Sequence, residues 1–177
     1  MNHMDRKFLF QGNVISLIAS LVILYGLVLL ELNGIGYALS PTFLGIMTVV
    51  WAVAIPSFLS YHRSKLQKQW IMDYFAVSAI VITLVGLILA FLHSFLGIEV
   101  IVAGYTLEPI AGISIYLTAN QISRLYSSLF FWGAVIFTAG LPLYLFHAGV
   151  VSIVGDIVKM VGIIMLLTKG KVTTPSR

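Results

Sequence analysis

Three ionisable residues lie inside stretches that are otherwise almost free of charge: Glu108, Asp156 and Lys159. Ionisable groups inside membrane hydrocarbon are costly and usually face a partner or water, so each is a candidate functional residue. Glu108 and Lys159 follow the glycines Gly104 and Gly155 by four residues each and carry opposite charges. Asp156 precedes Lys159 by one helical turn on nearly the same helix face. We therefore predict an ion pair between Glu108 and Lys159 near the middle of the membrane, with Asp156 beside it.

Three roles are open for this charged cluster. A buried ion pair can hold helices in register, because losing either partner leaves the other charge alone. The second role is a proton or ion path along the cluster. Pro109 favours such a path, because a proline lacks the amide that would bind the carbonyl of Tyr105, four residues earlier, and that carbonyl is then free to line a cavity. The third role is contact with another subunit.

Two histidines form a second constellation. His93 and His147 follow Gly86 and Gly140 by seven residues each. Both therefore lie at the ends of helices that are predicted to run from the inner to the outer side of a membrane. Such a pair could ligate a haem b axially, or sense pH, since the unperturbed pKa of histidine is about 6.5. Alternatively, both imidazoles are interfacial and meet water. We expect no cofactor, with haem b between His93 and His147 as the alternative, and we expect His62 to be merely solvated.

The composition explains why these residues stand out. Of the 177 residues 60% are hydrophobic and 9% are charged, whereas a soluble domain has about 25% charged residues. A transmembrane helix needs about 20 apolar residues. Four windows meet that length, residues 13–32, 37–61, 73–95 and 98–119, and a longer apolar run over 125–168 is about twice one crossing and must turn back near residues 147–149.

The windows pair into hairpins that go out and come back. The expected order is an N-terminal segment over residues 1–12, hairpin 1 over 13–61, a basic loop over 62–72, hairpin 2 over 73–119, a loop over 120–124, hairpin 3 over 125–168 and a tail over 169–177. We thus expect an all-α polytopic membrane protein with six transmembrane helices. Aromatic residues near helix ends, such as Tyr61, Trp70 and Tyr74, are expected to form an interfacial belt, whereas Trp51 is expected to be lipid-facing or core bulk.

The distribution of cations predicts the orientation. Lys and Arg near helix ends are retained on the cytoplasmic side. Nine of the ten fall on one side of the predicted hairpins: Arg6, Lys7, Arg63, Lys65, Lys68, Arg124, Lys169, Lys171 and Arg177. Both termini are therefore predicted to be cytoplasmic in a cell membrane, and the basic residues need no explanation as nucleic-acid contacts.

Glycines recur in the three hairpins. Gly-Leu-x-Leu near the end of each outgoing helix begins at Gly26, Gly86 and Gly140, and the last two returning helices carry Gly104 with Gly112 and Gly155 with Gly162. Helices in lipid associate through close packing at small residues, so glycines at one level of each hairpin predict sites where two backbones approach closely. Alternatively, glycine is simply frequent in membrane helices, and for any single glycine we prefer this interpretation.

Three such hairpins resemble the HdeD-type acid-resistance family of membrane proteins over roughly residues 13–168. The resemblance implies a small polytopic protein linked to stress tolerance and supplies no catalytic residues. The chain departs from the pattern at Asn33, His93 and His147, where that family tends to have proline, and in its first returning helix, which has Gly45 only.

Common catalytic motifs are absent from the sequence. It has no cysteine, Gly-x-Ser-x-Gly, His-Glu-x-x-His, paired-aspartate motif of the lipid-head-group transferases or glycine-rich phosphate loop. We expect a non-enzymatic protein of the lipid bilayer that permits permeation of protons, ions or small solutes or supports stress tolerance, and that forms homo-oligomers or binds partner subunits. The alternative is an accessory subunit of a larger membrane complex, for example a respiratory one, in which the charged cluster meets a partner helix.

Overall fold

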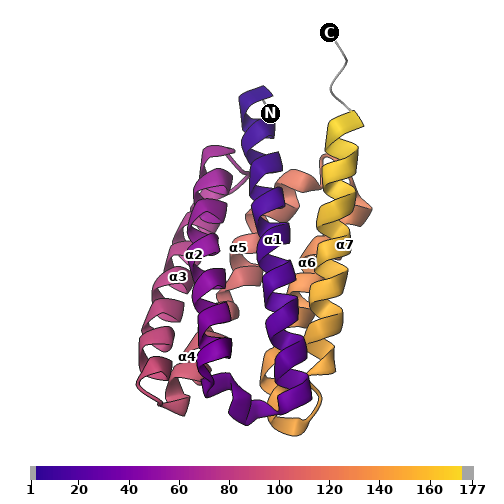
Figure 1. Ribbon diagram of the computed structural model, residues 1–177. Coiled ribbons are helices and arrows are strands. Elements are labelled where there is room, and N and C mark those ends of the chain that lie inside the picture. Colours follow the sequence, from indigo (N-terminus) through magenta and orange to yellow (C-terminus); the bar gives the residue numbers. More distant parts are fainter. Residues whose placement is uncertain (1–2, 173–177) are drawn as a thin grey trace.

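The computed structural model describes residues 3–172, which form helices joined by short turns and contain no strand (Figure 1). The elements are α1 (His3–Asn33), the 3-10 helix η1 (Ile35–Leu39), α2 (Pro41–Arg63), α3 (Gln69–Phe91), α4 (Phe95–Tyr105), α5 (Leu107–Ala119), α6 (Arg124–Gly140), the 3-10 helix η2 (Leu141–Phe146) and α7 (Val150–Val172). The all-α expectation is therefore confirmed for the described residues.

Six helical spans within the described residues are long and apolar enough to cross a membrane. Four consist of α1, α2, α3 and α7; α4 with α5 forms another, and α6 with η2 forms the last. Large apolar side chains such as Ile18, Val81 and Ile157 are about half exposed on the outside of the bundle, as a lipid-facing surface requires. The chain is thus a multi-pass membrane protein with the six spans expected from its sequence.

The ends of the spans differ from the sequence-based windows. α1 begins at His3 rather than Asn13, and α3 covers Gln69–Phe91 rather than residues 73–95. Much of the expected polar segments 1–12 and 62–72 is therefore helical. Hydropathy marks only the apolar part of a helix, whereas backbone hydrogen bonds continue into polar turns that meet water. α2 begins only at Pro41, because Ser40 caps it by accepting a hydrogen bond from the Phe43 amide at 3.2 Å.

The spans form a closed circuit. Each span contacts the next one along the chain, and α7 returns to contact α1. Figure 1 shows that the start of α1 and the end of α7 lie at the same end of the bundle, whereas η1, the α3–α4 turn and η2 lie at the opposite end. We refer to these two ends as the terminal end and the turn end.

Glycines bring the helix backbones together in hairpin 2, which comprises α3, α4 and α5. A Cβ atom at Gly86 would lie 2.8 Å from the backbone of Ile101, one at Gly97 would meet the backbone of Gly86 at 2.6 Å, and one at Gly104 would lie 2.5 Å from Thr83 Oγ1. Only a residue without a side chain allows this approach. The close packing predicted for Gly86 and Gly104 is therefore present.

Hairpin 3, which comprises α6, η2 and α7, has the same kind of contact on a larger scale. A Cβ atom would collide with the facing backbone at four described glycines of the α6–α7 interface, namely Gly133, Gly140, Gly155 and Gly162. The facing backbone is that of Lys159 for Gly133 and that of Phe137 for Gly155. The charged residue Lys159 is thus positioned directly by a glycine contact.

The two glycine contacts repeat in register. Thr83 faces Gly104 in hairpin 2, and Phe137 faces Gly155 in hairpin 3. The outgoing members are 54 residues apart and the returning members are 51 residues apart. The same 51-residue step relates Glu108 to Lys159. The structure therefore supports the proposed equivalence of these two positions.

Other glycines of the predicted pattern do not bring backbones together. A Cβ atom at Gly112 would meet only a ring atom of Phe130, at 3.9 Å, and one at Gly45 would meet nothing within 4 Å. Gly26 faces only side chains of α2. At Gly26 and Gly112 the alternative interpretation holds, that glycine is simply frequent in membrane helices, because the sequence spacing does not reveal which side of a helix faces a neighbour.

Candidate functional site

The returning span of hairpin 2 is broken at Thr106, near the middle of its length. Pro109 has no amide hydrogen, and in a continuous helix its ring would clash with the carbonyl of Tyr105. α4 therefore ends at Tyr105, and the Thr106 hydroxyl donates to the carbonyl of Ala103 at 2.7 Å. The break places Glu108 in the first turn of α5, where free helix amides favour an acidic side chain.

Lys159 binds two acidic side chains. Its Nζ atom lies 3.3 Å from Glu108 Oε1 and 3.0 Å from Asp156 Oδ1, and it also lies 4.6 Å from the ring centroid of Phe137. The ammonium group is thus enclosed by α5, α6 and α7. The structure therefore brings together the three residues that the sequence singled out, and we call Glu108, Asp156 and Lys159 the charged triad.

The members of the triad differ in their exposure. The side chains of Lys159 and Asp156 are 2% and 0% exposed, whereas that of Glu108 is 37% exposed. Neither oxygen of Asp156 accepts a hydrogen bond of good geometry, and the buried Ser20 hydroxyl on α1, which lies near it, also has no hydrogen-bond partner. Exchange with the surroundings is therefore confined to Glu108.

The charges of the triad do not balance. Two carboxylates and one ammonium carry a net charge of −1 when all three are ionised. An uncompensated charge in the membrane interior is costly, so the triad favours uptake of one more positive charge. A proton or a cation can supply it.

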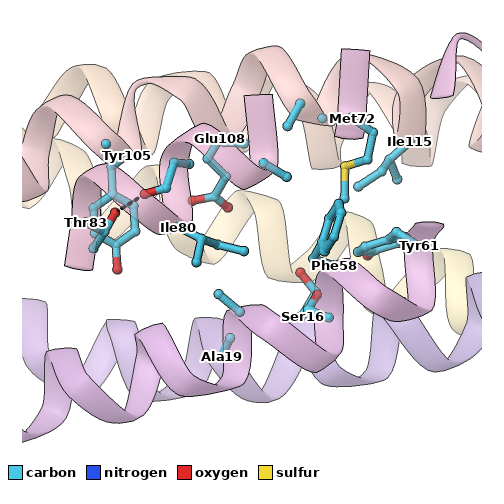
Figure 2. Close-up of a pocket in the computed structure, with 18 of the residues that line it drawn as sticks. Ser16, Ala19, Phe58, Tyr61, Met72, Ile80, Thr83, Tyr105, Glu108 and Ile115 are labelled. Carbon is cyan, nitrogen blue, oxygen red and sulfur yellow. Dashed lines mark hydrogen bonds between the residues drawn. The ribbon is translucent and has the colours of Figure 1, made fainter. Parts of the chain in front are cut away.

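Glu108 reaches into a cavity of about 160 Å³ lined by residues of helices α1 to α6. Figure 2 shows its carboxylate in the middle of this cavity, with Thr83 and Tyr105 towards one end and Ser16, Phe58 and Tyr61 towards the other. Apart from Glu108, the polar side chains of the wall belong to Ser16, Ser57, Tyr61, Thr83, Tyr105 and Trp51. We call this space the central cavity.

Tyr105 separates the central cavity from a second one. The second cavity, of about 60 Å³, lies towards the turn end and shares Ile23 and Tyr105 with the first. The Tyr105 ring packs edge-on against Phe137 with their centroids 5.7 Å apart. The sequence predicted that the carbonyl of Tyr105 lines a cavity. In the structure, the side chain of Tyr105 lies in the wall between two cavities.

Two aromatic residues of the wall have roles that the sequence did not reveal. The indole of Trp51 donates to the carbonyl of Ile80 at 3.0 Å, and its ring packs against the hydrophobic core and lines the central cavity, so the core placement is the correct one of the two expected for Trp51. Tyr61 is 2% exposed and its hydroxyl donates to Asn13 Oδ1 at 2.8 Å. The prediction that Tyr61 belongs to an interfacial belt is therefore wrong, because Gly12 leaves room for its ring inside the bundle.

The two candidate histidines lie far from the triad along their helices. His93 and His147 are exposed in turns at the turn end, and both adopt left-handed backbone conformations, with φ of 59° and 57°. Histidine is one of the few residues other than glycine that are enriched there. In hairpin 1, which comprises α1, η1 and α2, the residue with a positive φ is Gly34, at 79°, and not Asn33. The histidines thus reverse the chain, while haem ligation and pH sensing stay predictions.

His62 has specific partners at the terminal end. Its Nδ1 atom lies 2.8 Å from Asp73 Oδ1, and the amide of Gln69 donates to the His62 carbonyl at 2.9 Å. The expectation that His62 is merely solvated is therefore wrong. The contact joins the end of α2 to the start of α3, which sequence position alone does not reveal.

The chemical capacity of the site follows from its geometry. No family model, curated protein or solved structure matches the chain. Within residues 3–172 no group of three or more His, Asp or Glu side chains could hold a metal ion. The arrangement instead offers one half-exposed carboxylate, backed by a sealed ammonium and a sealed second carboxylate, to a small cavity inside the membrane.

Proposed function

We propose that this protein provides a path for protons or small cations across the membrane, with Glu108 as the group that binds and releases them. The observation that carries the proposal is the exposure of Glu108 to the central cavity next to a triad that is one positive charge short of neutrality. A structural ion pair needs neither the third charged residue nor the cavity.

The triad supports a simple exchange. With a proton on Glu108, Lys159 keeps Asp156 as its partner, and the triad is neutral. When the proton leaves, Lys159 faces two carboxylates and the site regains its negative charge. A proton and a cation are therefore alternative occupants of the same place, and Tyr105 stands as the barrier towards the second cavity.

The orientation proposed for this path rests on the charges at the two ends. The terminal end carries Arg6, Lys7, Arg63, Lys65, Lys68, Arg124 and Lys169, whereas the described turns at the other end carry no Lys or Arg. Since cations are retained on the cytoplasmic side, both termini are cytoplasmic in this proposal. The central cavity then lies in the cytoplasmic half of a cell membrane.

The sequence also predicted roles other than a path for protons or cations. Asp156 and Lys159 are buried within one chain, which favours a role inside the bundle over contact with a partner helix. A non-enzymatic role in stress tolerance, implied by the resemblance to the HdeD-type family, is compatible with proton movement. Homo-oligomers and partner subunits remain predictions that co-purification would test.

Vesicle flux tests the proposal. The purified protein is reconstituted into vesicles that contain a pH-sensitive dye, and an imposed pH difference is allowed to decay. We expect decay faster than in empty vesicles and a return to the empty-vesicle rate in Glu108→Gln. Glu99→Gln is the matched control, because Glu99 is an exposed carboxylate at the turn end. Equal rates for the wild-type protein and Glu108→Gln would reject the path.

A further inference from the structure

The central cavity combines features that select one class of ligand. We infer that it binds a small hydrophobic organic monocation, an ammonium that carries about one ring-sized apolar group, in exchange for the proton on Glu108. The inference rests on the proposed function in one respect, the exchange at Glu108, and adds the substrate class.

The size of the cavity sets the size of the ligand. Its volume is about 160 Å³, and an apolar cavity of about 150 Å³ is known to hold one benzene molecule. Most of the wall is aliphatic or aromatic, so the cavity favours an apolar group over a hydrated inorganic ion. A single ring with a short charged arm fits this description.

The aromatic side chains of the wall present apolar ring surface. The wall includes Trp51, Phe58, Tyr61, Tyr105, Phe130 and Phe131. The polar tips of Trp51 and Tyr61 are already bound, to the Ile80 carbonyl at 3.0 Å and to Asn13 at 2.8 Å. These two rings therefore offer the cavity no free N–H or O–H donor. Aromatic rings attract organic cations, most strongly where water is excluded.

Glu108 supplies the negative charge of the central cavity. It is the one Asp, Glu, Lys, Arg or His among the residues of the wall. The titratable groups around it are Lys159 and Asp156 on α7, Tyr105 on α4 and Tyr61 on α2, and the wall residues of α1, α3 and α6 add none. An anion would meet a net negative triad, whereas a monocation completes the charge balance. Binding should therefore weaken as the pH falls and protons occupy the site.

Trp51 provides a direct readout of binding. Trp70 and Trp132 are 67% and 59% exposed on the outside of the bundle, so Trp70→Phe with Trp132→Phe leaves Trp51 as the reporter in the cavity. This variant in lipid nanodiscs is titrated with benzyltrimethylammonium, whose charge does not change with pH. We expect a saturable fluorescence change, weaker binding at lower pH and an affinity at least about tenfold lower in Glu108→Gln, since that variant removes one partner of a buried charge pair.

Two controls make the result decisive. Neopentylbenzene has the same shape without the charge, and equal binding of both compounds with no effect of Glu108→Gln would overturn the inference. Gly112→Leu fills the cavity without a backbone clash, because a Cβ atom there meets only Phe130 at 3.9 Å, and it should abolish binding. Failure of benzyltrimethylammonium to bind while Glu108-dependent proton flux persists would reject this inference alone. Binding of benzyltrimethylammonium without proton flux would reject the proposed path but would still support the inferred binding site.

Discussion

Hairpins 1 and 3 solve the problem of helix association in different ways. In hairpin 3, four glycines place the backbones of α6 and α7 in contact, and Gly133 lies against the backbone of Lys159. In hairpin 1, Gly26 meets only side chains and Gly45 faces open space. The membrane-embedded charges Asp156 and Lys159 lie on the close-packed hairpin, whereas hairpin 1 contributes uncharged walls to the central cavity. The difference teaches that the two fully buried charges lie on the hairpin whose backbones pack most closely, whereas the hairpin with fewer such contacts supplies only uncharged residues to the cavity wall.

The largest effect is expected from removing the charge that hairpin 3 carries. Lys159→Met leaves Asp156 buried without its partner, and loss of one member of a buried ion pair costs about 3–5 kcal/mol. Unfolding of the purified variant in mixed micelles measures this loss. Adding Asp156→Asn should restore much of the stability, and an unchanged unfolding midpoint in Lys159→Met would show that the triad does not stabilise the fold.

Two glycine substitutions test the difference in helix packing between hairpin 3 and hairpin 1 directly. Gly155→Leu forces a side chain into the backbone of Phe137, and overpacking of this kind costs about 1–3 kcal/mol or more. Gly45→Leu is the matched control, because nothing lies within 4 Å of a Cβ atom there. Melting curves should show a clear loss for Gly155→Leu and little change for Gly45→Leu. Equal losses would contradict the contrast between the hairpins.

The smallest effect is expected at the turns. His147 has a left-handed backbone conformation with φ of 57°, which glycine adopts freely and a β-branched residue does not. His147→Gly should therefore retain the melting temperature, whereas His147→Val should lose about 1 kcal/mol. The absorption spectrum of the wild-type protein is recorded alongside. A Soret band that both variants lose would replace this conformational role with haem ligation.

The sequence could predict the spans and the ion pair for related reasons. In a chain with 9% charged residues, an acid and a base within apolar spans are rare, so the two can be predicted to pair from the sequence alone. Repeated spacing then placed Glu108 and Lys159 at equivalent depths, and their atoms lie 3.3 Å apart. A charged residue in an apolar span can be recognised from the sequence, because the prediction depends on one residue type at one position.

The cavity could not be predicted in the same way. Its wall is assembled from six helices, and an apolar residue that faces a cavity reads the same in the sequence as one that faces lipid. Trp51 in the wall and Trp70 on the outside illustrate this. Hydropathy also missed the helical polar turns at the start of α1 and α3, because helix ends depend on backbone hydrogen bonds and not on apolar character.

Infrared spectroscopy of the protonated carboxyl group tests the central claim most directly, since it observes the proton on Glu108 without requiring transport. We expect the wild-type protein in nanodiscs to show a protonated-carboxyl band that disappears reversibly as the pH is raised, and we expect Glu108→Gln to lack this band while Glu99→Gln retains it. A spectrum in which Glu108→Gln keeps the same titrating band would contradict the assignment of proton exchange to the half-exposed member of the charged triad.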